Sequence, residues 1–356
     1  MKQPLYIFSN TILKKKNDTI LMETLADPPG DSDDCEPAEE EFLIGADIDI
    51  PKGEKRSFPV ETVDSIFAFG TIRFNTPFLS MLSNYHIPMH VFNFYGGYKG
   101  SFLPVKDQRS GGVLMCQMHH FADNYKRLWL AKTFVEGSSL NLLANINYHK
   151  NRGASLNAEA AAMEEIMELI NNTGGIEELM GIEGTIKKVY FNGWKQILKQ
   201  PFNFTKRQRN PPPDPVNALI SFGNMVVYSF CLNEIYHTRL YPEVGYLHSP
   251  GDNKLPLSYD IAEIFKPIIT DRAIFKLVNK NMISENDFSV KNGSCLIKKP
   301  ARKMYVRELD SRIATVINNR QNDRNMSYRR IIRTECHKLI THLQGEAVYK
   351  PFKSRW

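Results

Sequence analysis

Residues 214–239 read DPVNALISFGNMVVYSFCLNEIYHTR and form the most apolar helix that the sequence predicts. Asp214 followed by Pro215 is typical of a helix start, because proline in the first turn gives up no hydrogen bond. Apolar side chains then follow on every face, including Leu219, Val226 and Phe230. Since a helix that is apolar all round lies inside a core, this stretch predicts the central helix of a helical domain.

Helical patterns also flank this stretch. Residues 113–135 have helical spacing, and residues 158–170 are rich in Ala, Glu and Met and end at NNTGG. We therefore expect residues 111–356 to form an all-α domain.

Residues 1–105 have a different pattern, in which short apolar runs alternate with turn residues. A hairpin is predicted for the first 25 residues, and Thr76-Pro77 is expected to cap and open a short helix. The fold class is therefore α+β, with a β-rich N-terminal domain before the helical one. The apolar runs of the N-terminal domain are residues 5–8, 11–13, 19–22, 65–69, 89–94 and 98–103.

Charge is distributed unevenly along the 356 residues. The net charge is only +6, but residues 26–50 hold ten acids and no Lys or Arg, so the rest of the chain has 45 bases and 29 acids. We expect residues 26–50 to be a solvated, mobile acidic insertion. A body with a net charge of +16 favours an acidic polymer as partner, although scattered surface lysines of a small-substrate enzyme are the alternative.

Several function classes lack their sequence signatures. No phosphate-binding GxxxxGK[ST] loop and no GxGxxG motif after a strand is present, and the five cysteines form no CxxC pair. No run approaches the roughly 18 apolar residues of a membrane span, and the N-terminus MKQPLYIFSN lacks the apolar region of a secretory signal. We expect a cytoplasmic protein that does not bind membranes, dinucleotides or a thiolate-held metal.

Polar residues in apolar settings mark three segments that could carry chemistry. Glu183 lies between Gly181 and Gly184 in a predicted helix, where close approach of another backbone would explain the glycines. His248 ends the run VGYLH, and Asp260 and Glu263 stand three apart on one helical face. Each signal alone has an ordinary explanation: a solvated Glu, or a His that is satisfied locally.

Taken together, one His and three carboxylates beside buried segments predict an oxygen and nitrogen site. Such a site suits Mn²⁺ or Mg²⁺ better than a metal that prefers thiolates. A divalent cation there would bind a phosphodiester oxygen and activate an attacking hydroxyl, which is the chemistry of nucleases and strand transferases.

The order and spacing of GIEG, Tyr190-Phe191, DPVNALISFGNMVVY, VGYLH and LPLSYDIAEIFKP resemble a known family. It is the CRISPR-associated endonuclease and integrase of spacer acquisition, the first universal Cas protein. The resemblance extends over the N-terminal strands, the block FGTIRFNTPFLSMLSNYHIPMHVFNFYGGYKGSFLP and the ending SYRRIIRTECHKLITHLQGEAVYKPF. Only residues 26–50 have no counterpart in this pattern.

This resemblance implies a β-rich domain that forms a homodimer and an α-helical catalytic domain that binds Mg²⁺ or Mn²⁺. The metal ligands that it implies are Glu183, His248 and Glu263. Asp260 matches a further required position and could act beside a ligand or on a second ion. The implied partners are DNA, double-stranded and branched, and the second universal Cas protein.

The stretch 185–210 is the main candidate for DNA binding, because it holds seven Lys or Arg, no acid, and interleaved aromatic residues. Phosphate pairing together with aromatic stacking is the pattern of a strand-binding groove. The residues predicted to contact DNA are Lys187, Lys188, Tyr190, Lys195, Arg207 and Arg209. The tail from residue 298 is also basic, but a solvated helix face explains it equally well.

Two alternative functions stay open at this point. The first is a noncatalytic nucleic-acid-binding subunit whose acids are structural. The second, a metallohydrolase of small phosphate esters, is disfavoured by the strongly basic body.

Overall fold

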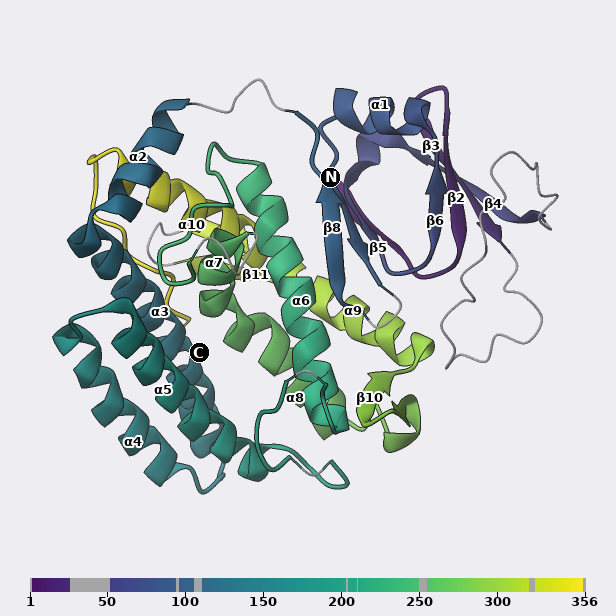
Figure 1. The fold of residues 1–356 in the computed structure, drawn as a ribbon. Helices are drawn as coiled ribbons and strands as arrows, with labels where there is room; N and C mark the ends of the chain where they lie inside the picture. The colour runs from purple at the N-terminus through teal and green to yellow at the C-terminus, as the bar shows by residue number, and fades with distance from the viewer. Residues whose placement is uncertain are drawn as a thin grey trace. The chain divides into compact units, whose positions relative to one another are not determined.

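The computed structural model describes residues 2–25, 52–93, 96–105, 111–202, 204–209, 211–249, 255–319 and 324–354. The chain divides into two units: Met1–Asp107 with Lys298–Lys303, and Gln108–Ile297 with Met304–Trp356. Strands dominate the first unit and helices the second, as Figure 1 shows. The predicted acidic insertion at residues 26–50 lies outside the described residues.

The first unit contains two four-stranded sheets, with the strand orders β1-β5-β7-β8 and β4-β3-β2-β6, and the helix α1 (Thr76–Asn84). Its core lies between the two sheets and α1, and includes Leu13, Ile66 and Phe78. The strands are β1 (Gln3–Ile7), β2 (Thr11–Lys16), β3 (Thr19–Leu25), β4 (Lys52–Pro59), β5 (Val63–Ala68), β6 (Ile72–Phe74), β7 (Met89–Phe92) and β8 (Tyr98–Phe102).

Two local predictions for this unit are corrected. The hairpin consists of β2 and β3 alone, because β1 pairs in parallel with β5 in the other sheet. Asn75 instead of Thr76 caps α1, since its side chain accepts a hydrogen bond from the amide of Phe78 at 3.2 Å.

The second unit is mostly helical. The predicted helix over residues 113–135 is two helices, because the side chain of Asp123 accepts from the amides of Tyr125 and Lys126 and starts a new one. The helices are α2 (Gly111–Ala122), α3 (Asn124–Lys150), α4 (Asn157–Glu168), α5 (Ile176–Ile197), α6 (Pro215–Tyr236), α7 (Pro256–Lys266), α8 (Arg272–Asn279), α9 (Lys299–Ala314) and α10 (Tyr328–Leu343). The start of α9, up to Lys303, belongs to the first unit.

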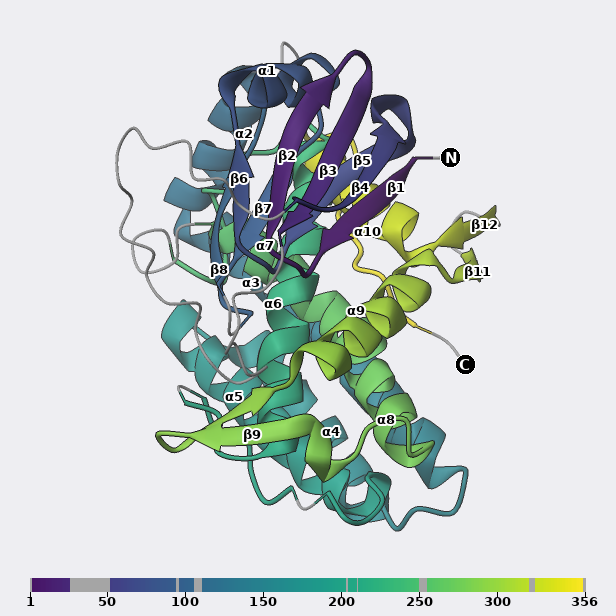
Figure 2. The same cartoon turned by 90° about the vertical axis from the view of Figure 1, so that its right-hand side faces the viewer.

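The second unit also contains two antiparallel strand pairs, so it is not all-α. They are β9 (Phe288–Lys291) with β10 (Ser294–Ile297), and β11 (Val316–Asn319) with β12 (Arg324–Ser327). Figure 2 labels β9 in the first of these pairs, and its partner β10 packs against α6. Asn292 and Gly293, both with positive φ, make the turn between β9 and β10, a conformation that Asn and Gly tolerate.

The helix α6 is the central helix of this unit, as its sequence predicts. By length and composition it could cross a membrane, but most of its side chains are buried inside the unit, including the polar Asn217 and Glu234. Asp214 caps it by accepting from the amide of Asn217 at 2.8 Å. It is therefore the core helix of a packed domain.

The helices around α6 bring the candidate site together. The helix α7 packs against both α6 and α3, and α3 in turn packs against α4 and α5. In Figure 1, α3, α4 and α5 lie side by side. Residues on α5, on α7 and on the loop before α7 can therefore meet.

Candidate active site

Glu183 and Glu263 come from two helices and share one ammonium group. Lys187, one turn after Glu183 on α5, places its Nζ 2.6 Å from Glu183 Oε1 and 2.7 Å from Glu263 Oε2. The other oxygen of Glu263 accepts from Lys266, one turn further along α7. Two carboxylates and two ammonium groups thus form one nearly buried ion cluster, which we call the carboxylate cluster.

This cluster keeps the carboxylate of Glu263 ionised. Burial by itself would raise the pKa of Glu263, but the charges of Lys187, Lys266 and His248 outweigh it and lower that pKa. For Lys187, burial would lower the pKa, and the charges of Glu183 and Glu263 raise it instead. The charged forms of Glu263 and Lys187 therefore stabilise one another.

His248 is oriented by the buried carboxylate of Asp260. Its Nδ1 lies 2.7 Å from Asp260 Oδ1, and its own amide donates to the same oxygen at 3.0 Å. The amides of Tyr246 and Leu247 donate to Oδ2 at 2.6 and 3.2 Å. Because its oxygens are engaged in this way, Asp260 acts through His248 and leaves the imidazole Nε2 for another contact.

The loop that carries His248 is also held from α2 and α3. The buried Gln117 exchanges hydrogen bonds with the backbone of Tyr241, and Arg127 donates to the carbonyl of Tyr246 at 3.0 Å. Gly245 makes the turn possible, since a Cβ there would lie 2.7 Å from Pro256 Cβ. His248 is therefore on a loop with a defined shape.

The protonation of His248 responds to the same neighbours. Burial lowers its pKa, but the hydrogen bond and charge of Asp260, together with the charges of Glu263 and Glu183, outweigh burial and raise it. The charges of Glu263 and Glu183 thus reach the imidazole, whose hydrogen-bond partner is Asp260. The carboxylate oxygens near this imidazole are of the donor type that Mg²⁺ and Mn²⁺ prefer.

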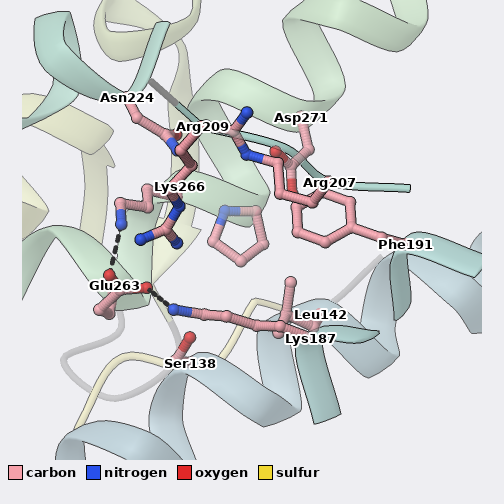
Figure 3. Close-up of a pocket in the computed structure, with 11 residues that line it drawn as sticks. Ser138, Leu142, Lys187, Phe191, Arg207, Arg209, Asn224, Glu263, Lys266 and Asp271 are labelled. Atoms are coloured by element: carbon pink, nitrogen blue, oxygen red, sulfur yellow. Dashed lines mark hydrogen bonds and ion pairs between the residues drawn. The ribbon is translucent and has the colours of Figure 1, made fainter. Parts of the chain in front are cut away.

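A pocket opens beside the carboxylate cluster, and cationic side chains make up much of its wall (Figure 3). Glu263 and Asp271 are its two acids. A pocket with this balance suits a phosphate group that lies next to a cation. The residues lining it are Ser138, Leu142, Lys187, Phe191, Arg207, Arg209, Asn224, Glu263, Lys266, Pro267 and Asp271.

Comparison with known proteins identifies the family. The family model "CRISPR associated protein Cas1" matches residues 5–311. The chain belongs to the Cas1 family. A relative from Fusobacterium nucleatum, named CRISPR-associated endonuclease Cas1, is 39% identical over 100% of this chain and 98% of its own length.

Solved structures agree with this assignment. A Cas1 protein from Thermotoga maritima superposes with a TM-score of 0.81 at 30% identity, covering 98% of this chain and 99% of that one. A casposase bound to its integration product has a TM-score of 0.81 at 16% identity, over 99% of this chain and 94% of the other. A chain of a Cas6-RT-Cas1–Cas2 complex has a TM-score of 0.79 at 17% identity, over 100% of this chain and 36% of that one. At such identities the last two show the fold.

The residues that the Cas1 resemblance implies as metal ligands have suitable donor atoms. Their side chains are not, however, already arranged around one metal position. Among the described residues, no three His, Cys, Asp or Glu side chains are grouped so that they could hold a metal ion. Glu183 and Glu263 nevertheless converge on one cation, the ammonium of Lys187, within 2.7 Å. Carboxylates that converge on a monovalent cation provide the oxygen donors that a divalent one requires.

The residues predicted to bind DNA differ in their exposure to solvent and in their contacts. Lys188, Lys195 and Arg209 are exposed. Lys187 belongs to the carboxylate cluster, and Arg207 donates to Asn217 Oδ1 and Ser221 Oγ on α6, both at 2.9 Å. Three of the predicted residues therefore present their charge to solvent.

Tyr190 corrects the prediction. Its ring is completely buried, and its hydroxyl donates to Asp271 at 2.8 Å and accepts from Asn145 at 3.1 Å. It packs edge-on against Trp194, which is also completely buried. Tyr190 therefore has no face left on which a base could stack, and it belongs to the core.

The glycines beside Glu183 are also explained differently. A Cβ added to Gly181 or Gly184 would meet no other atom within 4 Å, so close backbone approach is not their reason. Nothing in the structure explains why these two positions are glycine.

Sequence reasoning missed the interactions that organise the site, since it predicted Lys187 only as a DNA contact. Lys187 and Lys266 stand four and three residues after their carboxylates, a helical spacing that predicts ion pairs and could have revealed them. Gln117 and Arg127 contact a loop more than a hundred residues away, so no local pattern marks them.

Proposed function

We propose that this chain is a divalent-metal-dependent DNA endonuclease and integrase of the CRISPR adaptation module. It inserts captured DNA fragments into the CRISPR repeat array by strand transfer. The observation that carries the proposal is the convergence of Glu183 and Glu263 beside a cationic pocket, with His248 oriented by Asp260 nearby. The names of the Cas1 relatives and the fold shared with a casposase bound to an integration product support it.

Glu183, His248 and Glu263 would hold Mg²⁺ or Mn²⁺. When bound, the cation would neutralise charge that develops on the phosphoryl oxygens and on the leaving oxygen as a 3′-hydroxyl attacks. The chain's own groups prepare this site: Asp260 orients His248 through its Nδ1, and Lys266 holds one oxygen of Glu263.

Lys266 is itself fixed, because its ammonium also lies over the ring of Tyr228, 4.5 Å from the centroid. The guanidinium groups of Arg207 and Arg209 line the pocket, where they would bind and orient the phosphate. The donors for the substrate are thus in place before the substrate arrives.

The proposed assembly is a homodimer formed through the β-rich first unit, together with Cas2. Support for the Cas2 partner comes from the fold shared with a chain of the Cas6-RT-Cas1–Cas2 complex. Size-exclusion chromatography with light scattering tests the homodimer, and a pull-down with purified Cas2 tests the partner.

A cleavage and strand-transfer assay with labelled branched DNA tests the chemistry, in Mn²⁺ and in EDTA. We expect wild-type protein to cleave and join DNA in Mn²⁺ and to be inactive in EDTA. His248→Ala, Glu183→Gln and Glu263→Gln should each lower activity by at least about a hundredfold. Mutating a residue that only hydrogen-bonds to a metal ligand already lowers metal affinity or activity by about tenfold to a hundredfold. All three should still shift DNA in a gel, because cationic residues hold the phosphates.

The alternative, a noncatalytic DNA-binding subunit, makes a different prediction in the same assay. If wild-type protein shifts DNA but does not cleave or join it in Mn²⁺ with or without Cas2, the catalytic proposal is wrong.

A further inference from the structure

Lys187 lies where the proposed function needs a divalent cation. Its Nζ is within 2.7 Å of one oxygen from each of Glu183 and Glu263, and the ammonium is the cation on which these two carboxylates converge. A divalent ion cannot share both oxygens with a cation at this distance, because the two like charges would repel one another strongly in a poorly hydrated site. Lys187 and the metal therefore exclude each other.

We infer that Lys187 is an exchangeable internal cation, which closes the carboxylate pair in the metal-free protein and moves into the adjacent pocket to bind a phosphate oxygen when the metal enters. This inference rests on the proposed metal site. It assigns to one side chain two alternative positions, each with an anionic partner.

The pocket provides the second position. Lys187 already lines it together with Arg207, Arg209 and Lys266, so rotation about the side-chain bonds suffices and no backbone movement is required (Figure 3). Once displaced, its ammonium would stand near two guanidinium groups. An oxyanion in the pocket relieves that repulsion, and a phosphodiester of DNA is such an anion.

The exchange predicts thermodynamic coupling between cation and anion. The metal releases an ammonium that an anion needs, and the anion stabilises the displaced ammonium, so each should raise the affinity for the other by the same factor. Lys266 cannot substitute, because Glu263 and the ring of Tyr228 hold it from two sides. The coupling should therefore depend on Lys187.

Isothermal titration calorimetry with Mn²⁺ tests this without any catalytic readout. Lys187→Met should bind Mn²⁺ about tenfold or more tightly than wild type, since no ammonium has to leave. Lys280→Met is the matched control, because Lys280 is exposed in the same unit, has no place in the proposed site, and its loss changes the net charge equally. It should bind Mn²⁺ as wild type does.

A second measurement needs only the wild-type protein, in case Lys187→Met does not fold without metal. Sulfate serves as the probe for a tetrahedral oxyanion. At constant ionic strength, replacing chloride with sulfate should tighten Mn²⁺ binding severalfold in wild type and in Lys280→Met, and should have no effect in Lys187→Met.

The outcomes separate this inference from the proposed function. Equal Mn²⁺ affinity of wild type and Lys187→Met, or weaker binding by Lys187→Met, would overturn the exchange and leave the metal site intact. An absence of any sulfate effect in wild type would also overturn it. If none of the proteins binds Mn²⁺, both the metal site and the exchange are wrong.

Discussion

Asp260 is a completely buried carboxylate that accepts hydrogen bonds from three backbone amides and an imidazole. Asp260→Asn replaces one acceptor with an NH₂ group that would face N–H donors. We expect this variant to lose about 3 kcal/mol of unfolding free energy, because buried bonds to a charged group are worth about 1.5–3 kcal/mol each. Urea unfolding measures the loss.

The control is Asp18→Asn, because Asp18 is an exposed residue of the first unit. Its free energy of unfolding should equal that of wild type within about 0.5 kcal/mol. If both variants unfold at the same urea concentration, Asp260 does not hold the His248 loop.

Asp271 is the second buried carboxylate that lines the pocket, and its pKa is shifted in the opposite direction to that of Glu263. Burial raises its pKa to about 7, although the hydroxyl of Tyr190 donates to it. The folded protein therefore keeps a proton on Asp271 that the unfolded chain loses near pH 4. Stability from this group is fully present below about pH 4 and is lost as the pH rises through 7.

Asp271→Asn imitates the protonated form at every pH. It should be more stable than wild type by up to about 4 kcal/mol at pH 8, and the difference should shrink towards zero near pH 4. Urea unfolding at pH 4.5, 6 and 8 checks this. A difference that stays constant with pH would contradict the raised pKa.

Contacts between secondary-structure elements also stabilise the site. The C-terminal segment 349–354 contacts both α3 and α7. The buried Asn141 on α3 donates to the carbonyls of Ile264 and Phe352 at 2.9 and 3.1 Å, and accepts from the amide of Ser354 at 2.7 Å. Phe352 also stacks on Phe265 of α7. The helix with Asp260 and Glu263 is thus supported by α3 and by the C-terminal segment.

Asn141→Ala should therefore reduce stability by about 3 kcal/mol, because it leaves buried backbone groups without partners. Hydrogen exchange should speed up in α7 and in segment 349–354 more than in α4. Asn192→Ala, at an exposed position on α5, is the control. Unchanged exchange in α7 would show that the segment does not support it.

For the whole molecule, the distribution of charge governs DNA binding. Lys188 and Lys195 are exposed on α5. Changing both to Gln should lower the slope of log affinity against log salt by about 2, because each phosphate contact contributes about 0.9. Filter binding between about 50 and 200 mM salt measures the slope.

The control changes the exposed Lys15 and Lys16 at the end of β2 to Gln, which removes the same net charge from the first unit. If both double variants have the same slope, α5 is not a DNA contact and the effect is one of net charge alone.

The parts of this fold that depend on residues close together in the sequence could be predicted, whereas those that depend on distant residues could not. The apolar pattern of residues 214–239 and its Asp-Pro start predict α6 correctly, because burial on all faces and capping act within one helix. β1 was assigned to the wrong partner, since strand pairing depends on distant residues, and β5 lies more than fifty residues away. The two small strand pairs of the second unit were not predicted, because each of their strands has only four residues and so short a run carries little periodicity.

The sequence by itself determined the family, the α+β class and the segments that carry Glu183, His248, Asp260 and Glu263, because these follow from local periodicity and motif spacing. Only the tertiary structure decided what each side chain meets. Tyr190 looked like a base-stacking residue and is in the core. Lys187 looked like a phosphate contact and bridges two carboxylates, since packing α5 near α7 brings Glu263 within 2.7 Å of its ammonium, and a buried charge takes the nearest opposite charge.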